Sequence, residues 1–225
     1  GDPDRYYSAF FRNPDSAIDG GGVHSNSGVG NKLVYLLTDG DTFNNQTVEG
    51  KGIDSVAELV YTALPLLTES ATYFDYYLAL GAASVTLEYD FADRLNLARG
   101  GRAVEIEPPD LFEEGLRNFR AVSAFDLENN PVAVLYWTNP PSEQYGQVTL
   151  VRSLTSYVGS PEEGTKLYEG REDRFLDRDV LPGVRYYYTL FVDMLSGLPQ
   201  IAYASLTAGI ETPKTLTEAF AASPA

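Results

Sequence analysis

One histidine and one nearby aspartate form the strongest chemical feature of this sequence. His24 is the only histidine among 225 residues, and it lies in the segment Asp19-Gly-Gly-Gly-Val-His24-Ser-Asn-Ser-Gly28. A carboxylate close to an imidazole fixes the tautomer of the ring, and a helix that begins after His24 presents unpaired amide donors to the same space. Together they would place an imidazole of fixed tautomer beside unpaired amide donors. A lone histidine at the entry of a capped helix is also an ordinary structural feature.

Other segments resemble binding motifs but fail on their spacing. Residues 39–45 suggest a calcium loop, yet Phe43 and Gly50 occupy positions where an EF-hand needs oxygen ligands, so an irregular surface loop is expected. The glycines before Lys32 suggest a phosphate cradle, but Leu33 stands where Ser or Thr should follow the lysine. Two pairs of adjacent glutamates are expected to be solvated surface: Glu113-Glu114 and Glu162-Glu163.

The first half of the chain, which must position His24, has the periodicity of helices from Asn26 to about Ile106. The first helix is expected to be capped by Ser25 or Asn26 and to end at Asp39-Gly-Asp41. Three more helices are expected: one entered through Gly50-Lys-Gly52, one capped by Ser70 or Thr72, and one over Phe91–Ile106. Gly100-Gly101 weakens the last of these, because a glycine inside a helix costs roughly 1 kcal/mol relative to alanine.

The second half changes to the alternation of β-strands after Pro108-Pro109, where a helix cannot continue. Apolar residues recur at every second position, for example at Val132, Val134 and Tyr136, and Pro/Gly turns separate the runs. Short alternating strands with turns at this spacing predict an antiparallel sandwich. The fold class is therefore multidomain: an all-α domain followed by an all-β sandwich.

Composition excludes several classes of partner. The net charge of −16 disfavours binding to nucleic acid or to an anionic membrane, and no apolar run is long enough to span a bilayer. The chain has no cysteine, which excludes disulfides and thiolate ligands. A hydrophobic content of 44% allows a substantial core.

Residues 1 to about 106 resemble the C-terminal half of thermolysin-like neutral zinc metalloproteases. The resemblance is carried by an ordered series of segments: Gly1-Asp-Pro-Asp4, Asp19 to Gly28, Asn31-Lys32, Tyr35-Leu36-Leu37, Val48-Glu-Gly-Lys-Gly52 and Tyr61-Thr-Ala-Leu64-Pro-Leu-Leu-Thr68. It implies that His24 donates to the oxygen of the tetrahedral intermediate and that Asp19 orients His24. It also implies that Asn26 caps the helix and that Tyr6 and Tyr7 line the base of that helix.

The zinc motif of that family, His-Glu-x-x-His, is absent from this chain. Thermolysin-type sites need two histidines one helical turn apart, a glutamate base and a further glutamate ligand. The chain alone is therefore expected to hold no metal and no cofactor and to be inactive. The resemblance implies that zinc, and also calcium, are bound in the complete enzyme by an N-terminal lobe of the same protein, with a peptide or protein as substrate.

Residues 117–209 resemble a fibronectin type III domain, with Trp137 in its core and Tyr186 at a tyrosine corner. The expected division is a helical domain over 1–106, a linker over 107–116, the sandwich over 117–209 and a tail over 210–225. The leading hypothesis is the C-terminal portion of a secreted zinc endopeptidase. The alternative is a non-enzymatic module that binds proteins or surfaces through a reused helical lobe and a sandwich.

Overall fold

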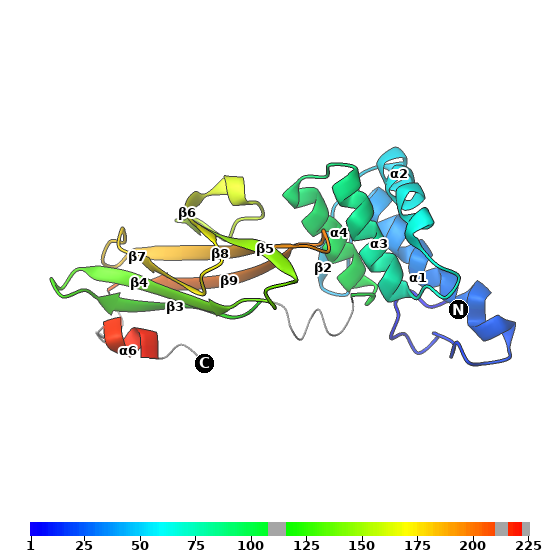
Figure 1. The fold of residues 1–225 in the computed structure, drawn as a ribbon, viewed down its shortest axis with the longest axis horizontal. Coiled ribbons are helices and arrows are strands. Elements are labelled where there is room, and N and C mark those ends of the chain that lie inside the picture. Colours follow the sequence, from blue (N-terminus) through cyan, green and yellow to red (C-terminus); the bar gives the residue numbers. More distant parts are fainter. Residues whose placement is uncertain (108–115, 210–215, 222–225) are drawn as a thin grey trace. The chain divides into compact units, whose positions relative to one another are not determined.

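The computed structural model describes residues 1–107, 116–209 and 216–221. The chain divides into two compact units, one built from the helices between Asp19 and Ala103 and one from the strands between Arg117 and Thr207. Each unit has its own hydrophobic core. A helical domain followed by an antiparallel sandwich confirms the predicted fold class (Figure 1). Residues 108–115 of the predicted linker lie outside the described residues.

The helical unit contains four α-helices and one small hairpin among its described residues. The elements are α1 (Asp19–Asp39), β1 (Asp41–Phe43), β2 (Gln46–Val48), α2 (Ile53–Ala63), the short 3-10 helix Leu64–Leu66, α3 (Tyr73–Thr86) and α4 (Phe91–Ala103). Gly40 ends α1 and Gly52 precedes α2, both with positive φ. Thr72 caps α3 through a reciprocal capping box with Asp75, so the second of the two predicted caps is correct.

The segment after α1 is a β-hairpin, so the expectation of an irregular loop there is wrong. Asn44 and Asn45 both have positive φ, which is the conformation of a two-residue hairpin turn. Thr42 and Thr47 face each other across the ladder. Asparagine tolerates this conformation better than most residues, and this property is the signal in the sequence that predicts the turn.

Helix α4 ends at Ala103, three residues before the predicted end at Ile106. Close packing explains why two glycines occur inside this helix, and the periodicity of the sequence does not show it. A Cβ atom on Gly101 would lie 2.2 Å from Cε2 of the buried Tyr77 ring, and one on Gly100 would lie 3.1 Å from Cδ1 of Leu33. The absence of side chains thus lets α4 pack closely against α1 and α3, which offsets the low helix propensity of glycine.

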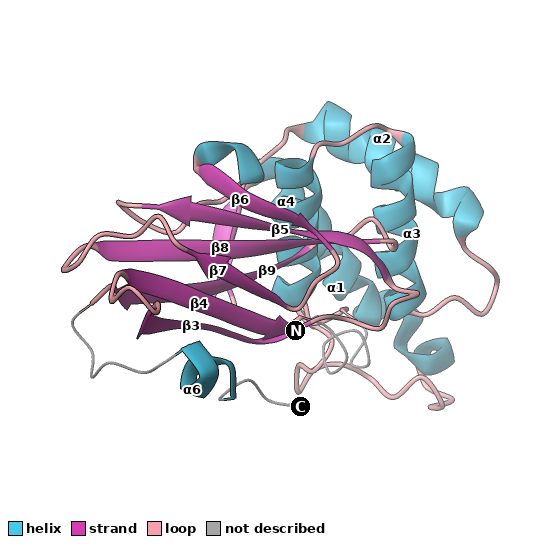
Figure 2. Cartoon of the chain, turned by 60° about the vertical axis from the view of Figure 1, so that its left-hand side comes forward, coloured by secondary structure: helices cyan, strands magenta, loops and turns pink. Residues whose placement is uncertain are grey.

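The second unit is a sandwich of two antiparallel sheets, with strand orders β3-β4-β7 and β6-β5-β8-β9 (Figure 2). The strands are β3 (Arg117–Phe125), β4 (Pro131–Thr138), β5 (Tyr145–Ser153), β6 (Thr165–Gly170), β7 (Arg174–Asp177), β8 (Arg185–Met194) and β9 (Gln200–Thr207). Trp137 is buried between the sheets, as predicted. The hydroxyl of Tyr186 accepts a hydrogen bond from Leu181 N at 2.9 Å, which is the bond of a tyrosine corner.

Both faces of β4 are buried, which the alternating pattern does not predict. Leu135 and Trp137 point into the core between the sheets, whereas Val134 and Tyr136 pack on the other face beneath helix α6 (Leu216–Ala221). Helix α6 contacts β3 and β4 and buries Ala219 completely (Figure 1). Part of the segment expected to be a tail is therefore a helix packed on the sandwich.

Candidate functional site

His24 and Asp19 are brought together at the start of α1. Asp19 Oδ1 lies 2.5 Å from His24 Nδ1, and Asp19 Oδ2 accepts a 3.4 Å hydrogen bond from Ser25 N. The His24 side chain is 88% exposed and that of Asp19 is 23% exposed. Nε2 of His24 makes no hydrogen bond to any of the residues that the structure describes. The imidazole is thus held on one side and open to solvent on the other.

The chain between these two residues is wound in the left-handed conformation. The φ angles are 57° at Asp19, 56° at Gly20, 85° at Gly21 and 79° at Gly22, and regular helix begins only after Gly22. The amides of Gly21 and Gly22 both donate to Ile18 O at 3.2 Å. This turn brings Asp19 back toward the first turn of the regular helix. Glycine is needed because other L-residues lose roughly 1–2 kcal/mol in this conformation.

Neither Ser25 nor Asn26 caps the helix, so that prediction is wrong. Both lie inside the helical segment, and the carboxylate of Asp19 accepts from the Ser25 amide instead. The buried side chain of Asn26 bonds to a different part of the chain, the backbone of Arg12. The periodic apolar pattern begins only at Val29. It therefore does not indicate which group bonds to the amides of the preceding turn.

The hydrogen bond from His24 lowers the pKa of Asp19 below its ordinary value, with a further contribution from the amide of Ser25. The carboxylate is therefore ionised at neutral pH and accepts a hydrogen bond from the N–H at Nδ1. This defines the tautomer of a neutral His24, in which Nδ1 carries the hydrogen.

The N-terminal segment packs against α3 and the end of α4. Tyr6 N donates to Val104 O at 2.9 Å, and the Tyr6 ring contacts those of Phe11, Tyr73 and Phe74. Tyr7 is 64% exposed, so it does not pack against the helices as Tyr6 does. A cavity of about 450 Å³ adjoins the first turns of α1, with Tyr6, Phe11, Val23, Asn26 and Tyr73 in its wall. His24 does not line it.

The described residues do not fit a catalytic metal. They contain no group of three or more His, Cys, Asp or Glu side chains that could hold a metal ion. With one histidine and no cysteine in the sequence, Asp19 and His24 cannot complete a zinc site. Among the described helices, none is long and apolar enough to cross a membrane.

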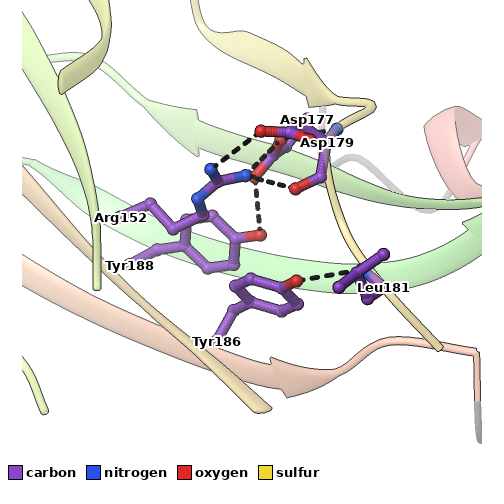
Figure 3. Close-up of polar contacts among 6 residues, drawn as sticks. All are labelled: Arg152, Asp177, Asp179, Leu181, Tyr186 and Tyr188. Carbon is purple, nitrogen blue, oxygen red and sulfur yellow. Dashed lines mark hydrogen bonds and ion pairs between the residues drawn. The ribbon is translucent and has the colours of Figure 1, made fainter. Parts of the chain in front are cut away.

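The sandwich contains a buried ionic cluster that was not predicted from the sequence. Arg152 Nη1 lies 3.0 and 2.9 Å from the two carboxylate oxygens of Asp177, and Tyr188 donates to the same carboxylate at 3.0 Å (Figure 3). Arg152 also binds the backbone oxygen and the side chain of Asp179. These residues come from three segments far apart in sequence, so no local spacing indicates them. The ion pair between Arg152 and Asp177 compensates two buried charges, and it does not indicate a bound ligand.

Comparison with known proteins shows which proteins the helical unit is similar to. Residues 2–93 match the family model of the thermolysin metallopeptidase alpha-helical domain. A zinc metalloproteinase from Renibacterium salmoninarum is 56% identical over 71 residues, which are 32% of this chain and 13% of that protein. Bacillolysin from Brevibacillus brevis is 38% identical over 85 residues, or 38% of this chain and 15% of that protein. The helical unit therefore matches the alpha-helical domain of the thermolysin metallopeptidases over residues 2–93.

The matches to these proteases cover only a small part of their length, 13% and 15%. Solved structures similar to the chain include a Fn3-like protein from Clostridium thermocellum, with 22% identity and a TM-score of 0.30 over 44% of this chain and 95% of that chain. Another is the pectate lyase Pel3 from Pectobacterium carotovorum, with 17% identity and a TM-score of 0.32 over 49% of this chain and 29% of that chain. The fibronectin type III-like character of the sandwich rests on its strand order, buried Trp137 and tyrosine corner.

Proposed function

We propose that this chain supplies the oxyanion-stabilising histidine of a secreted thermolysin-like zinc endopeptidase. In this proposal His24 donates to the developing oxyanion and Asp19 orients His24. The observation that carries it is the 2.5 Å contact between Asp19 and Nδ1 of an imidazole that is otherwise exposed. Such a donor acts best when it is fixed before the reaction begins.

In this proposal His24 acts in its doubly protonated state. Asp19 accepts the hydrogen bond from the N–H at Nδ1. Nε2 can therefore donate a second hydrogen bond only when the ring is protonated on both nitrogens. The ionised carboxylate of Asp19 supplies the counter-charge for that imidazolium. His24 thus presents a positively charged donor where negative charge develops in an acyl-transfer transition state.

The remaining parts of the site are proposed to lie elsewhere in the complete protein. An N-terminal lobe would supply zinc, the general base and the calcium sites, and a bound zinc ion would polarise the scissile carbonyl. The substrate would be a peptide or protein bond. The sandwich is proposed to be an accessory module, and no catalytic role is assigned to it.

The test is hydrolysis of a peptide by the complete protease with and without His24. His24→Ala is expected to lower kcat roughly 10²- to 10³-fold, the usual effect of losing one oxyanion donor, with the zinc content unchanged. Tyr61→Ala is a control because Tyr61 is 78% exposed on a different helix, α2. Unchanged hydrolysis by His24→Ala would refute the proposal. A complete protein without a His-Glu-x-x-His motif would favour the non-enzymatic alternative.

A further inference from the structure

The side chain of Asn26 forms a buried connection that no part of the proposed catalysis uses. Asn26 is only 7% exposed. Its Oδ1 accepts from Arg12 N at 2.9 Å, and its Nδ2 donates to Arg12 O at 2.9 Å and to Gly21 O at 3.3 Å. One amide group thus joins three backbone groups from two segments.

These bonds reach the turn between Asp19 and His24. Gly21 lies within that turn, and a Cβ atom on it would be 2.3 Å from Pro14 O. A Cβ on Gly22 would be 2.6 Å from Cβ of Arg12. The left-handed turn is therefore packed directly against residues 12–14, and Asn26 bonds to both sides of the contact. The amides of Gly21 and Gly22 bond to Ile18 O within the turn, whereas the hydrogen bonds of the Asn26 side chain connect the turn to Arg12.

We propose that Asn26 is a positioning residue, which fixes the glycine turn so that Asp19 stays on Nδ1 of His24. The inference rests on the proposed function, because its catalytic consequence requires His24 and Asp19 to act in hydrolysis. It goes beyond a capping role, since Asn26 acts through Gly21 and Arg12 and touches neither His24 nor Asp19 by a hydrogen bond.

A second contact at Asn26 makes the inference testable. The backbone oxygen of Asn26 accepts a 2.8 Å hydrogen bond from the hydroxyl of Tyr73 on α3. This bond does not involve the Asn26 side chain, so α1 retains its tie to α3 in Asn26→Ala. The variant is therefore expected to keep the helical unit folded while releasing the turn.

Asn96 provides a matched control within the same unit. It is 3% exposed, its Oδ1 accepts from Glu49 N at 2.8 Å, and its Nδ2 donates to Glu49 O at 2.9 Å. Asn96→Ala thus removes a buried amide that holds the backbone of one remote residue, as Asn26→Ala does. It leaves the turn around Gly21 untouched.

The experiment is an NMR titration of this 225-residue chain, in which His24 gives the only imidazole signals. We expect Asn26→Ala to move the carboxyl pKa of Asp19 up toward its ordinary value and to abolish the protected Nδ1 proton signal. Asn96→Ala should change neither signal. Asn26→Asp, which keeps an acceptor for Arg12 N but loses both donors, should also abolish the protected Nδ1 proton signal, and it replaces the alanine variant if that fails to fold. An unchanged Nδ1 proton signal in both Asn26 variants, an unchanged Asp19 titration in Asn26→Ala, or an equal change in Asn96→Ala would overturn the inference.

Peptide hydrolysis by the complete protease separates this inference from the proposed function. Asn26→Ala is expected to lower kcat roughly 10- to 100-fold, as small misplacements of catalytic groups do, and to leave KM unchanged. If the NMR signals change as expected but His24→Ala hydrolyses normally, the positioning of Asp19 stands and the proposed function fails. If His24→Ala is impaired but the NMR signals and kcat of Asn26→Ala are those of the wild type, the role of Asn26 fails alone.

Discussion

The carboxylate of Asp19 lies 2.5 Å from Nδ1 of His24 across a turn in which Asp19 itself has a positive φ of 57°. An aspartate in this conformation is strained, and its bonds to His24 and to the Ser25 amide offset the strain. The same residue thus contacts the imidazole and satisfies an amide at the start of the helix.

Asp19 should make the stability of the helical unit depend on pH in the acid range. Its pKa is lowered in the folded state, chiefly by His24, so its contribution is complete above the unfolded-state pKa of about 4 and is lost as pH falls through the folded-state pKa. Asp19→Asn should therefore be less stable than the wild type at neutral pH, and the difference should shrink below about pH 4. Urea unfolding followed by circular dichroism measures this. A stability difference between Asp19→Asn and the wild type that stays constant down to the lowest pH measured would contradict this prediction.

Glycines of the turn should differ in their tolerance to alanine. Gly20 and Gly21 both have positive φ, but a Cβ on Gly20 meets nothing closer than Val23 Cγ2 at 3.8 Å, whereas one on Gly21 lies 2.3 Å from Pro14 O. Gly20→Ala should cost about 1 kcal/mol from backbone strain alone. Gly21→Ala should cost more than about 2 kcal/mol, since the clash is with backbone. Equal losses of unfolding free energy in the two variants would show that the close approach to Pro14 is unimportant.

The paired glycines of α4 should also differ from each other. Gly101→Ala places a Cβ 2.2 Å from the ring of the buried Tyr77 and should destabilise the unit by about 1–3 kcal/mol. Gly100→Ala meets the ends of two leucine side chains at 3.1 and 3.2 Å, and helix propensity favours alanine by up to about 1 kcal/mol. Thermal unfolding should therefore show a larger loss for Gly101→Ala. The reverse order would contradict the packing of α4 described above.

The ion pair between Arg152 and Asp177 should be important for the sandwich, because the two side chains are only 13% and 3% exposed. Asp177→Ala leaves the guanidinium without its main partner and removes the acceptor of Tyr188, so a loss of about 3–5 kcal/mol is expected. Glu169→Ala, which breaks the exposed pair with Lys166 on β6, is the control and should change stability little. Similar losses in both variants, measured by urea unfolding, would contradict this assignment.

The sequence allowed prediction of helices α1 to α4, of strands β4, β5, β8 and β9, and of the pairing of Asp19 with His24, because each depends on local periodicity or on a short motif. It did not allow prediction of features that depend on contacts across long separations. Asn26 matched the preferences of a helix cap, but its partner Arg12 lies outside any local pattern. The outward-facing Val134 and Tyr136 are buried only because α6 packs over them, and alternation alone cannot indicate such a cover.

A double-mutant cycle on peptide hydrolysis tests most directly the claim that Asp19 acts through His24. The complete protease is compared as wild type, Asp19→Asn, His24→Ala and the double variant, with kcat/KM measured for one peptide. His24→Ala should lose roughly 10²- to 10³-fold, and adding Asp19→Asn to it should cause no further loss, since the residue that Asp19 orients is gone. Losses that multiply in the double variant, or full activity in His24→Ala, would contradict the account.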